Sequence, residues 1–169
     1  MARLHRQPLC VASALVVPMV TIASPSWLAI DGVGPCWAVL WLLPWALVDG
    51  PVSGAVAGAS VGLVLDGLSL DQMTQVPALL VLGWWWGRLG RRAGVVQRSL
   101  NLGFLAWLGA LIVGLTVLAQ FLLGVESEHA QMLVRWGLQT LACQVLITGI
   151  LAPLLVSLQL LIWRRRALG

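Results

Sequence analysis

The spacing of the charged residues is the sequence feature that most constrains this fold, because it leaves six long uncharged windows. A helix that crosses the hydrocarbon core of a membrane needs about 20 consecutive, mostly apolar residues. The windows therefore fit six membrane-spanning helices, and they leave little chain for a domain outside the membrane. They cover residues 7–30, 32–48, 50–65, 72–87, 99–125 and 136–163, and they hold 128 of the 169 residues.

The composition agrees with a chain whose surface faces lipid. Hydrophobic residues make up 60% and charged residues 9%, against about 45–50% and about 25% in soluble domains. The mean hydropathy is +0.95. These values argue against a soluble enzyme, a disulfide scaffold and a disordered chain. We predict an all-α polytopic membrane protein, a compact bundle of six transmembrane helices in a single domain over residues 1–169. The expected helices cover approximately residues 8–29, 33–49, 51–66, 74–89, 99–123 and 135–163.

The first window is the weakest of the six, because Pro18 and Pro25 interrupt it. A cleaved signal peptide is the alternative, with Arg3 and Arg6 in its basic region. No clear small-x-small cleavage site follows the apolar run, and Trp27 lies where such a site would be expected. We therefore expect a retained first helix.

The distribution of arginine predicts the orientation. With a cytoplasmic N-terminus and six crossings, nine of the ten Arg residues lie on the cytoplasmic side and only Arg135 lies outside. A five-helix arrangement without an early span would place Arg3 and Arg6 outside, against the positive-inside rule. Both termini are therefore expected in the cytoplasm. The basic pI near 10.2 is then a membrane signal, and no nucleic-acid partner is expected.

The amino-acid usage indicates the kind of gene that encodes the chain. The chain has ten Arg but no Lys, no Tyr and a single Asn, and the missing residues have AT-rich codons. This pattern indicates a GC-rich bacterial gene, so we expect the protein in the bacterial cytoplasmic (inner) membrane.

A stripe of small residues marks the third expected helix. Gly54, Gly58 and Gly62 recur every four residues and lie on one helical face. Such a stripe lets the backbone of another helix approach closely inside lipid. We predict helix packing at these three glycines and a central position for this helix in the bundle.

Two patterns resemble chemical sites but have simpler interpretations. Ser60 lies in a G-x-S-x-G sequence, which in hydrolases places a nucleophile next to a histidine. The two histidines, His5 and His129, fall outside the expected spans, and the chain has no lysine. The run from Glu126 to His129 lacks a second cluster that would complete a metal site. We therefore expect no catalytic residue, no metal site and no cofactor.

Aspartate residues near the outer side are the candidate partner-binding groups. Asp66 directly follows the apolar run of the third expected helix, and an ionisable group at that depth is a functional hypothesis by default. An interfacial acid exposed to water is the simpler alternative. Asp71 follows in the expected outer loop, and we take both carboxylates as candidates for contact with a partner.

An aromatic and basic segment ends the fourth expected helix. Tryptophan at the level of the headgroups, followed by arginine, is typical of a membrane-interface anchor. The basic loop would also attract anionic lipids, and a partner site there is the alternative. The anchor residues are Trp84, Trp85, Trp86, Arg88, Arg91 and Arg92.

Residues 40–92 resemble the rod shape-determining protein MreD family. The Gly-rich helix ends in Gly62-Leu63-Val64-Leu65-Asp66, which matches a G-L-x-x-D pattern. The next helix ends in Gly83-Trp84-Trp85-Trp86-Gly87-Arg88, which matches G-x-x-x-G-R. The chain departs from the family at the three consecutive tryptophans, because this segment has more tryptophan than is usual in the family.

The resemblance implies a non-enzymatic inner-membrane subunit of the rod-shape machinery that elongates the peptidoglycan side wall. Its expected partner is an MreC-like bitopic periplasmic protein. An MreB-like filament and the glycosyltransferase and transpeptidase of wall elongation would be indirect partners. The implied fold is similar to the six-helix substrate-binding subunits of energy-coupling-factor vitamin transporters.

Two other classes of function remain open at this stage. A substrate-binding membrane subunit of a small-molecule, vitamin-type transporter would need a pocket with convergent polar groups. An unrelated membrane enzyme is disfavoured because the chain lacks a general base and a metal set. The polar candidates for a transporter pocket are Asp31, Asp66, Gln72, Gln75 and Gln144.

Overall fold

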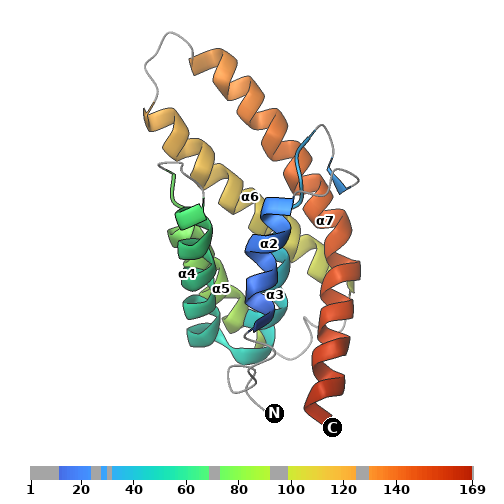
Figure 1. Ribbon diagram of the computed structural model, residues 1–169. Helices are drawn as coiled ribbons and strands as arrows, with labels where there is room; N and C mark the ends of the chain where they lie inside the picture. The colour runs from blue at the N-terminus through green and yellow to red at the C-terminus, as the bar shows by residue number, and fades with distance from the viewer. Residues whose placement is uncertain are drawn as a thin grey trace.

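The computed structural model describes residues 12–23, 28–29, 32–68, 73–91, 99–124 and 130–168. Helices joined by short connections make up this part of the chain (Figure 1), which confirms the predicted all-helical class for the described residues. The elements are η2 (Ser13–Leu15), α2 (Val16–Ala23), α3 (Trp37–Asp49), α4 (Pro51–Leu68), α5 (Val76–Gly90), α6 (Ser99–Gly124) and α7 (Ala130–Leu168).

Three described helices are long and apolar enough to cross a membrane, as expected for an all-α membrane protein. They are the segments Pro51–Leu68, Asn101–Leu123 and Val134–Ile162. Two further apolar helices, Ser13–Ala23 and Trp37–Asp49, are shorter than one full crossing. The charge spacing predicted a helix from residue 33, whereas α3 begins at Trp37, because an absence of charge does not distinguish connecting residues from helix. The number of crossings stays a prediction.

The centre of the bundle is α3, and not the glycine-rich α4 as the sequence suggested. Ten consecutive α3 residues, Ala38 to Leu47, are buried. A helix that is apolar on every side is suited to a position surrounded by other helices, and α3 contacts α2, α4, α5, α6 and α7. The glycines of α4 give it only one narrow packing face, since Val52, Val56 and Leu63 on the same helix are exposed.

Two antiparallel helical hairpins flank α3. The α4–α5 and α6–α7 pairs make the most extensive helix contacts among the described residues. In Figure 1 the end of α6 and the start of α7 extend beyond the α4–α5 pair. The 39 residues of α7 correspond to about 58 Å at about 1.5 Å per residue. This length exceeds the hydrocarbon core of about 30 Å, so α7 extends past the apolar layer.

The α4–α5 contact is a backbone-to-backbone contact at glycine. A Cβ on Gly54 would lie 2.4 Å from the carbonyl oxygen of Gly83, and one on Gly58 would lie 2.3 Å from that of Leu79. A Cβ on Gly62 would lie 2.8 Å from Val76 Cα. The structure thus places all three glycines of the predicted stripe against α5, at distances that no side chain permits.

A tight turn joins α3 to α4. Gly50 has φ +101° and ψ −179°, a backbone conformation that is essentially restricted to glycine. Pro51 then begins α4, a position where the missing N–H has no cost. The Ser53 hydroxyl donates a hydrogen bond to the Asp49 carboxylate and accepts one from the Trp45 indole at 3.1 Å. This end of the α4–α5 hairpin is therefore held by side chains of both α3 and α4.

Candidate functional site

The carboxylate of Asp66 joins the end of α4 to the start of α5. Its Oδ2 accepts a hydrogen bond of 2.5 Å from the Thr74 hydroxyl, and its Oδ1 accepts one of 3.0 Å from the Gln75 backbone N–H. The first N–H groups of a helix have no partner within the helix. Asp66 satisfies one of them from another helix, so within the chain it acts first as a helix-end acceptor.

Gln120 of α6 extends this network in a way that the sequence did not predict. Its Oε1 accepts a hydrogen bond of 2.9 Å from Thr74 N, and its Nε2 donates one of 2.9 Å to Thr74 O. An amide in a mostly apolar helix was the available signal, because polar residues in spans tend to find partners. Through Thr74, the start of α5 is fixed to both α4 and α6.

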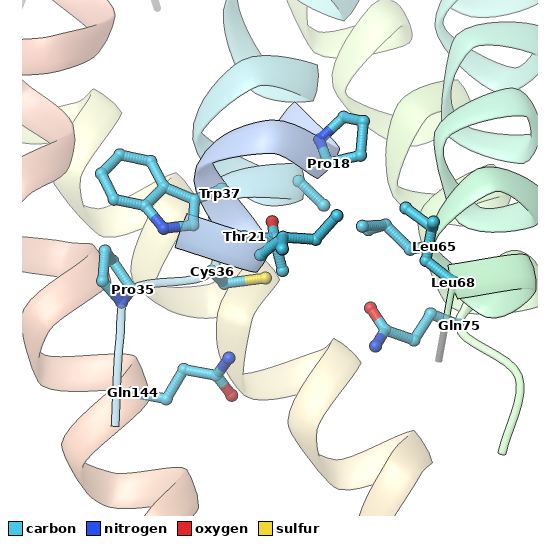
Figure 2. A pocket seen from close by; sticks show the side chains of 11 residues that line it. Pro18, Thr21, Pro35, Cys36, Trp37, Leu65, Leu68, Gln75 and Gln144 are labelled. Carbon is cyan, nitrogen blue, oxygen red and sulfur yellow. The ribbon is translucent and has the colours of Figure 1, made fainter. Parts of the chain in front are cut away.

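A cavity of about 240 Å³ lies beside this network. It is bounded by the end of α2, the start of α3, the end of α4, the start of α5 and the middle of α7. Figure 2 shows the side chains of Gln75 and Gln144 extending from opposite sides toward the same space. The other labelled residues around it are Pro18, Thr21, Pro35, Cys36, Trp37, Leu65 and Leu68.

A second cavity of about 450 Å³ shares Gln75 and Gln144 with the first. It lies between α6 and α7, next to Met73 in the connection before α5. Phe121 and Trp136 contribute aromatic wall. Gln75 and Gln144 are thus the described residues that line both cavities, and each carries a polar amide.

Among the described residues that line the two cavities, none is Asp, Glu, Lys or Arg. Gln75 and Gln144 are both partly buried. Thr148, fully buried one turn after Gln144, accepts a hydrogen bond of 2.9 Å from Cys36 N and donates one of 2.6 Å to Gln144 O. The bond from Cys36 N holds the start of α3 against α7, whereas the bond to Gln144 O lies within α7.

The residues of the predicted interface anchor divide into an exposed part and the buried Trp86. Trp84 is exposed and the Arg88 guanidinium lies 4.2 Å from its ring centre, an arrangement that favours a cation–π interaction. Arg91 is also exposed, and Trp85 is partly buried.

Trp86 does not belong to a surface anchor, which corrects the sequence prediction. Its side chain is fully buried, and its ring lies 2.4 Å from where a Cβ on Gly109 would be. Three consecutive residues of a helix point about 100° apart, so Trp84 and Trp86 cannot share one face. The sequence alone did not show which of them faces the bundle.

Several predicted residues lie outside the described part of the chain. They include the candidate partner residue Asp71, the anchor residue Arg92, and the pocket candidates Asp31 and Gln72. Ser60 of the G-x-S-x-G sequence is exposed and donates a hydrogen bond of 2.8 Å to Val56 O. Within the described residues, no group of three or more His, Cys, Asp or Glu could hold a metal ion.

Comparison of the chain with protein-family models, with curated proteins and with solved structures found no match.

Proposed function

We propose that this protein is a non-enzymatic subunit of the rod-shape machinery, similar to MreD, that acts by binding an MreC-like bitopic periplasmic protein. The observation that carries the proposal is the arrangement of the residues on which the resemblance rests. Gly62 and Asp66 of the first pattern, and Gly83 of the second, all contribute to the α4–α5 hairpin, through close backbone approach or through the bonds to Thr74 and Gln75. The two sequence patterns thus correspond to one structural unit.

This hairpin offers a partner an apolar helical face. On α4, Val52, Val56 and Leu63 are exposed on the sides away from the glycine stripe. Recognition between helices inside a membrane depends on packing of such faces and on a few polar groups. Because the Asp66 carboxylate is engaged within the chain, its contribution to partner binding is to hold the outer end of this hairpin in place.

The number of crossings, the orientation and the location of the protein are also part of the proposal. We propose six crossings, both termini in the cytoplasm and a bacterial inner-membrane location, with a fold similar to that of energy-coupling-factor substrate-binding subunits. The arginine distribution supports this orientation. The basic segment at Arg88 and Arg91 would then face anionic lipids of the cytoplasmic leaflet.

Depletion and capture test the function. In a rod-shaped bacterium whose own MreD is depleted, expression of this chain should restore rods from rounded cells. Affinity capture from the membranes should recover an MreC-like bitopic protein, and an unrelated tagged polytopic protein serves as the control. Asp66→Ala should weaken that capture without preventing membrane insertion, since loss of a charge does not oppose insertion. Failure to restore rods, combined with no bitopic partner, would overturn the proposal.

A transporter subunit is the second candidate, and one observation favours it. Two of the polar residues that such a subunit would need, Gln75 and Gln144, line the same two cavities. Copurification of an ATP-binding transport module in the capture experiment would support this candidate over the scaffold.

A further inference from the structure

We infer that the two cavities lined by both Gln75 and Gln144 form a binding site for a small, uncharged, planar molecule that carries an amide or lactam group. The inference goes beyond a scaffold function, and it rests only on the geometry of this site. Rod shape and ligand binding can therefore fail independently of each other.

Space is the first requirement, and the site provides it. The larger cavity, of about 450 Å³, lies within the range of about 300–1,000 Å³ that ligand pockets commonly have, and the smaller one adds about 240 Å³. Both take Gln75 and Gln144 as lining residues. A molecule of one or two rings beside these two residues would contact both amides.

The two amides supply the polar recognition. Each glutamine side chain carries a carbonyl acceptor and an NH₂ donor. Within the described part of the chain, the amide groups of Gln75 and Gln144 take part in no hydrogen bond, although backbone atoms of both residues do. Both residues are partly buried, and their amide groups face the same space (Figure 2). An occupant with complementary donors and acceptors can therefore bind both amides at once.

The walls determine the charge and the shape of the occupant. With no charged side chain among the described lining residues, an ion would lose its hydration without a counter-charge, which is costly. Trp37 lines the first cavity, and Phe121 and Trp136 line the second. Aromatic side chains give large flat contacts, so the site suits a planar ring with an amide edge.

The position of Gln75 is fixed before any ligand arrives. Its backbone N–H donates to Asp66 of α4, and the neighbouring Thr74 is held on both its N–H and its C=O by Gln120 of α6. A residue whose backbone is already held in place loses less conformational entropy on binding than one in a mobile segment. The Asp66–Thr74–Gln120 network therefore has a second consequence, which is to hold the backbone of one of the two glutamines.

Three probes of nearly equal size test the inference on the full chain in nanodiscs of neutral lipid. Benzamide carries the neutral amide, benzoate carries a charge in the same shape, and toluene carries neither. Ligand-observed NMR should detect benzamide at concentrations up to about 10 mM, the range in which so small a molecule is expected to bind. Benzoate should bind at least about tenfold more weakly, and toluene should not displace benzamide.

Variants assign the binding to the two glutamines. Gln75→Leu and Gln144→Leu should each weaken benzamide binding at least about tenfold. Gln139→Leu, on the exposed side of α7 and away from both cavities, should leave it unchanged.

Selectivity in the unmodified chain keeps the test decisive if a variant fails to fold. No binding of benzamide at concentrations up to about 10 mM would overturn the inference. Equal binding of benzoate, or displacement of benzamide by toluene, would also overturn it, because the amides would then play no part in recognition.

Discussion

At the scale of single residues, the α4–α5 contact depends on glycines, whose lack of a side chain lets the two backbones touch. Gly58 and Gly67 belong to the same helix, but their surroundings differ completely. A Cβ on Gly58 would lie 2.3 Å from a backbone oxygen of α5, whereas a Cβ on Gly67 would meet nothing within 4 Å. A backbone atom cannot rotate away as a flexible side chain can, so the two helices must separate to accept even one methyl group.

We expect Gly58→Ala to lower the free energy of unfolding by about 1–3 kcal/mol through overpacking. Gly67→Ala is the matched control and should be neutral or slightly stabilising, because alanine favours helix by about 0.5–1 kcal/mol over glycine. Unfolding in mixed detergent micelles measures both. Equal stability of the two variants would contradict the packing assigned to the stripe.

The tryptophans of α5 provide a second comparison at this scale. Trp86→Ala removes a fully buried ring and should destabilise the protein by about 3–5 kcal/mol. Trp84→Ala removes an exposed ring that lies under Arg88 and should cost less than about 1 kcal/mol. Thermal unfolding in the same detergent distinguishes them, and a reversed order would place Trp84 in the core.

At the scale of elements, the start of α5 is held by residues far from it in the sequence. Asp66 belongs to α4 and Gln120 to α6, and both bind the segment Thr74–Gln75. The first turn of a helix is less stable than its middle, because its N–H groups lack hydrogen-bond partners in the helix. The position of α5 therefore depends on the two helices beside it.

We expect Gln120→Leu to remove both bonds to the Thr74 backbone. Since Thr74 is exposed, water replaces part of the loss, and the free energy of unfolding should fall by only about 0.5–1.5 kcal/mol. Amide hydrogen exchange at Thr74 should become faster, while exchange in the buried α3 should not change. Gln139→Leu in α7 is the control. Unchanged exchange at Thr74 would contradict the role of Gln120.

At the scale of the whole molecule, the placement of charge predicts the orientation in the membrane. The predicted cytoplasmic side carries nine of the ten Arg residues, and translocating such clusters is unfavourable. Arg88 and Arg91 lie at the end of α5 near the α3–α4 turn, where a Cβ on Gly50 would lie 3.9 Å from Arg91 Nη2. That turn should therefore also be cytoplasmic.

Reporter fusions after Arg92 and after Gly169 should both report the cytoplasm, and a fusion after Glu128 should report the opposite side. The physical reason is the arginine bias on either side of the six expected crossings. A fusion at the same positions in a variant with Arg88, Arg91 and Arg92 replaced by alanine should show a mixed orientation. A periplasmic signal after Arg92 or Gly169 in the unmodified chain would overturn the six-crossing arrangement.

Some features follow from the sequence alone because they depend on composition and local spacing. Uncharged apolar windows dictate helices, since only a helix satisfies its own backbone groups in lipid. The four-residue spacing of Gly54, Gly58 and Gly62 dictates a close helix contact, since these positions share one face. The boundary between α3 and α4 also follows from Asp49-Gly50-Pro51.

Other features depend on tertiary structure, because they involve residues distant in sequence. Local spacing could not show that α3 is central, that Trp86 faces inward, or that Gln120 binds Thr74 across 46 positions of the chain. It also could not bring Gln75 and Gln144 to one cavity. The direction of a side chain in a helix bundle is set by which neighbours pack around it, and for a helix that is apolar on every side the sequence leaves that choice open.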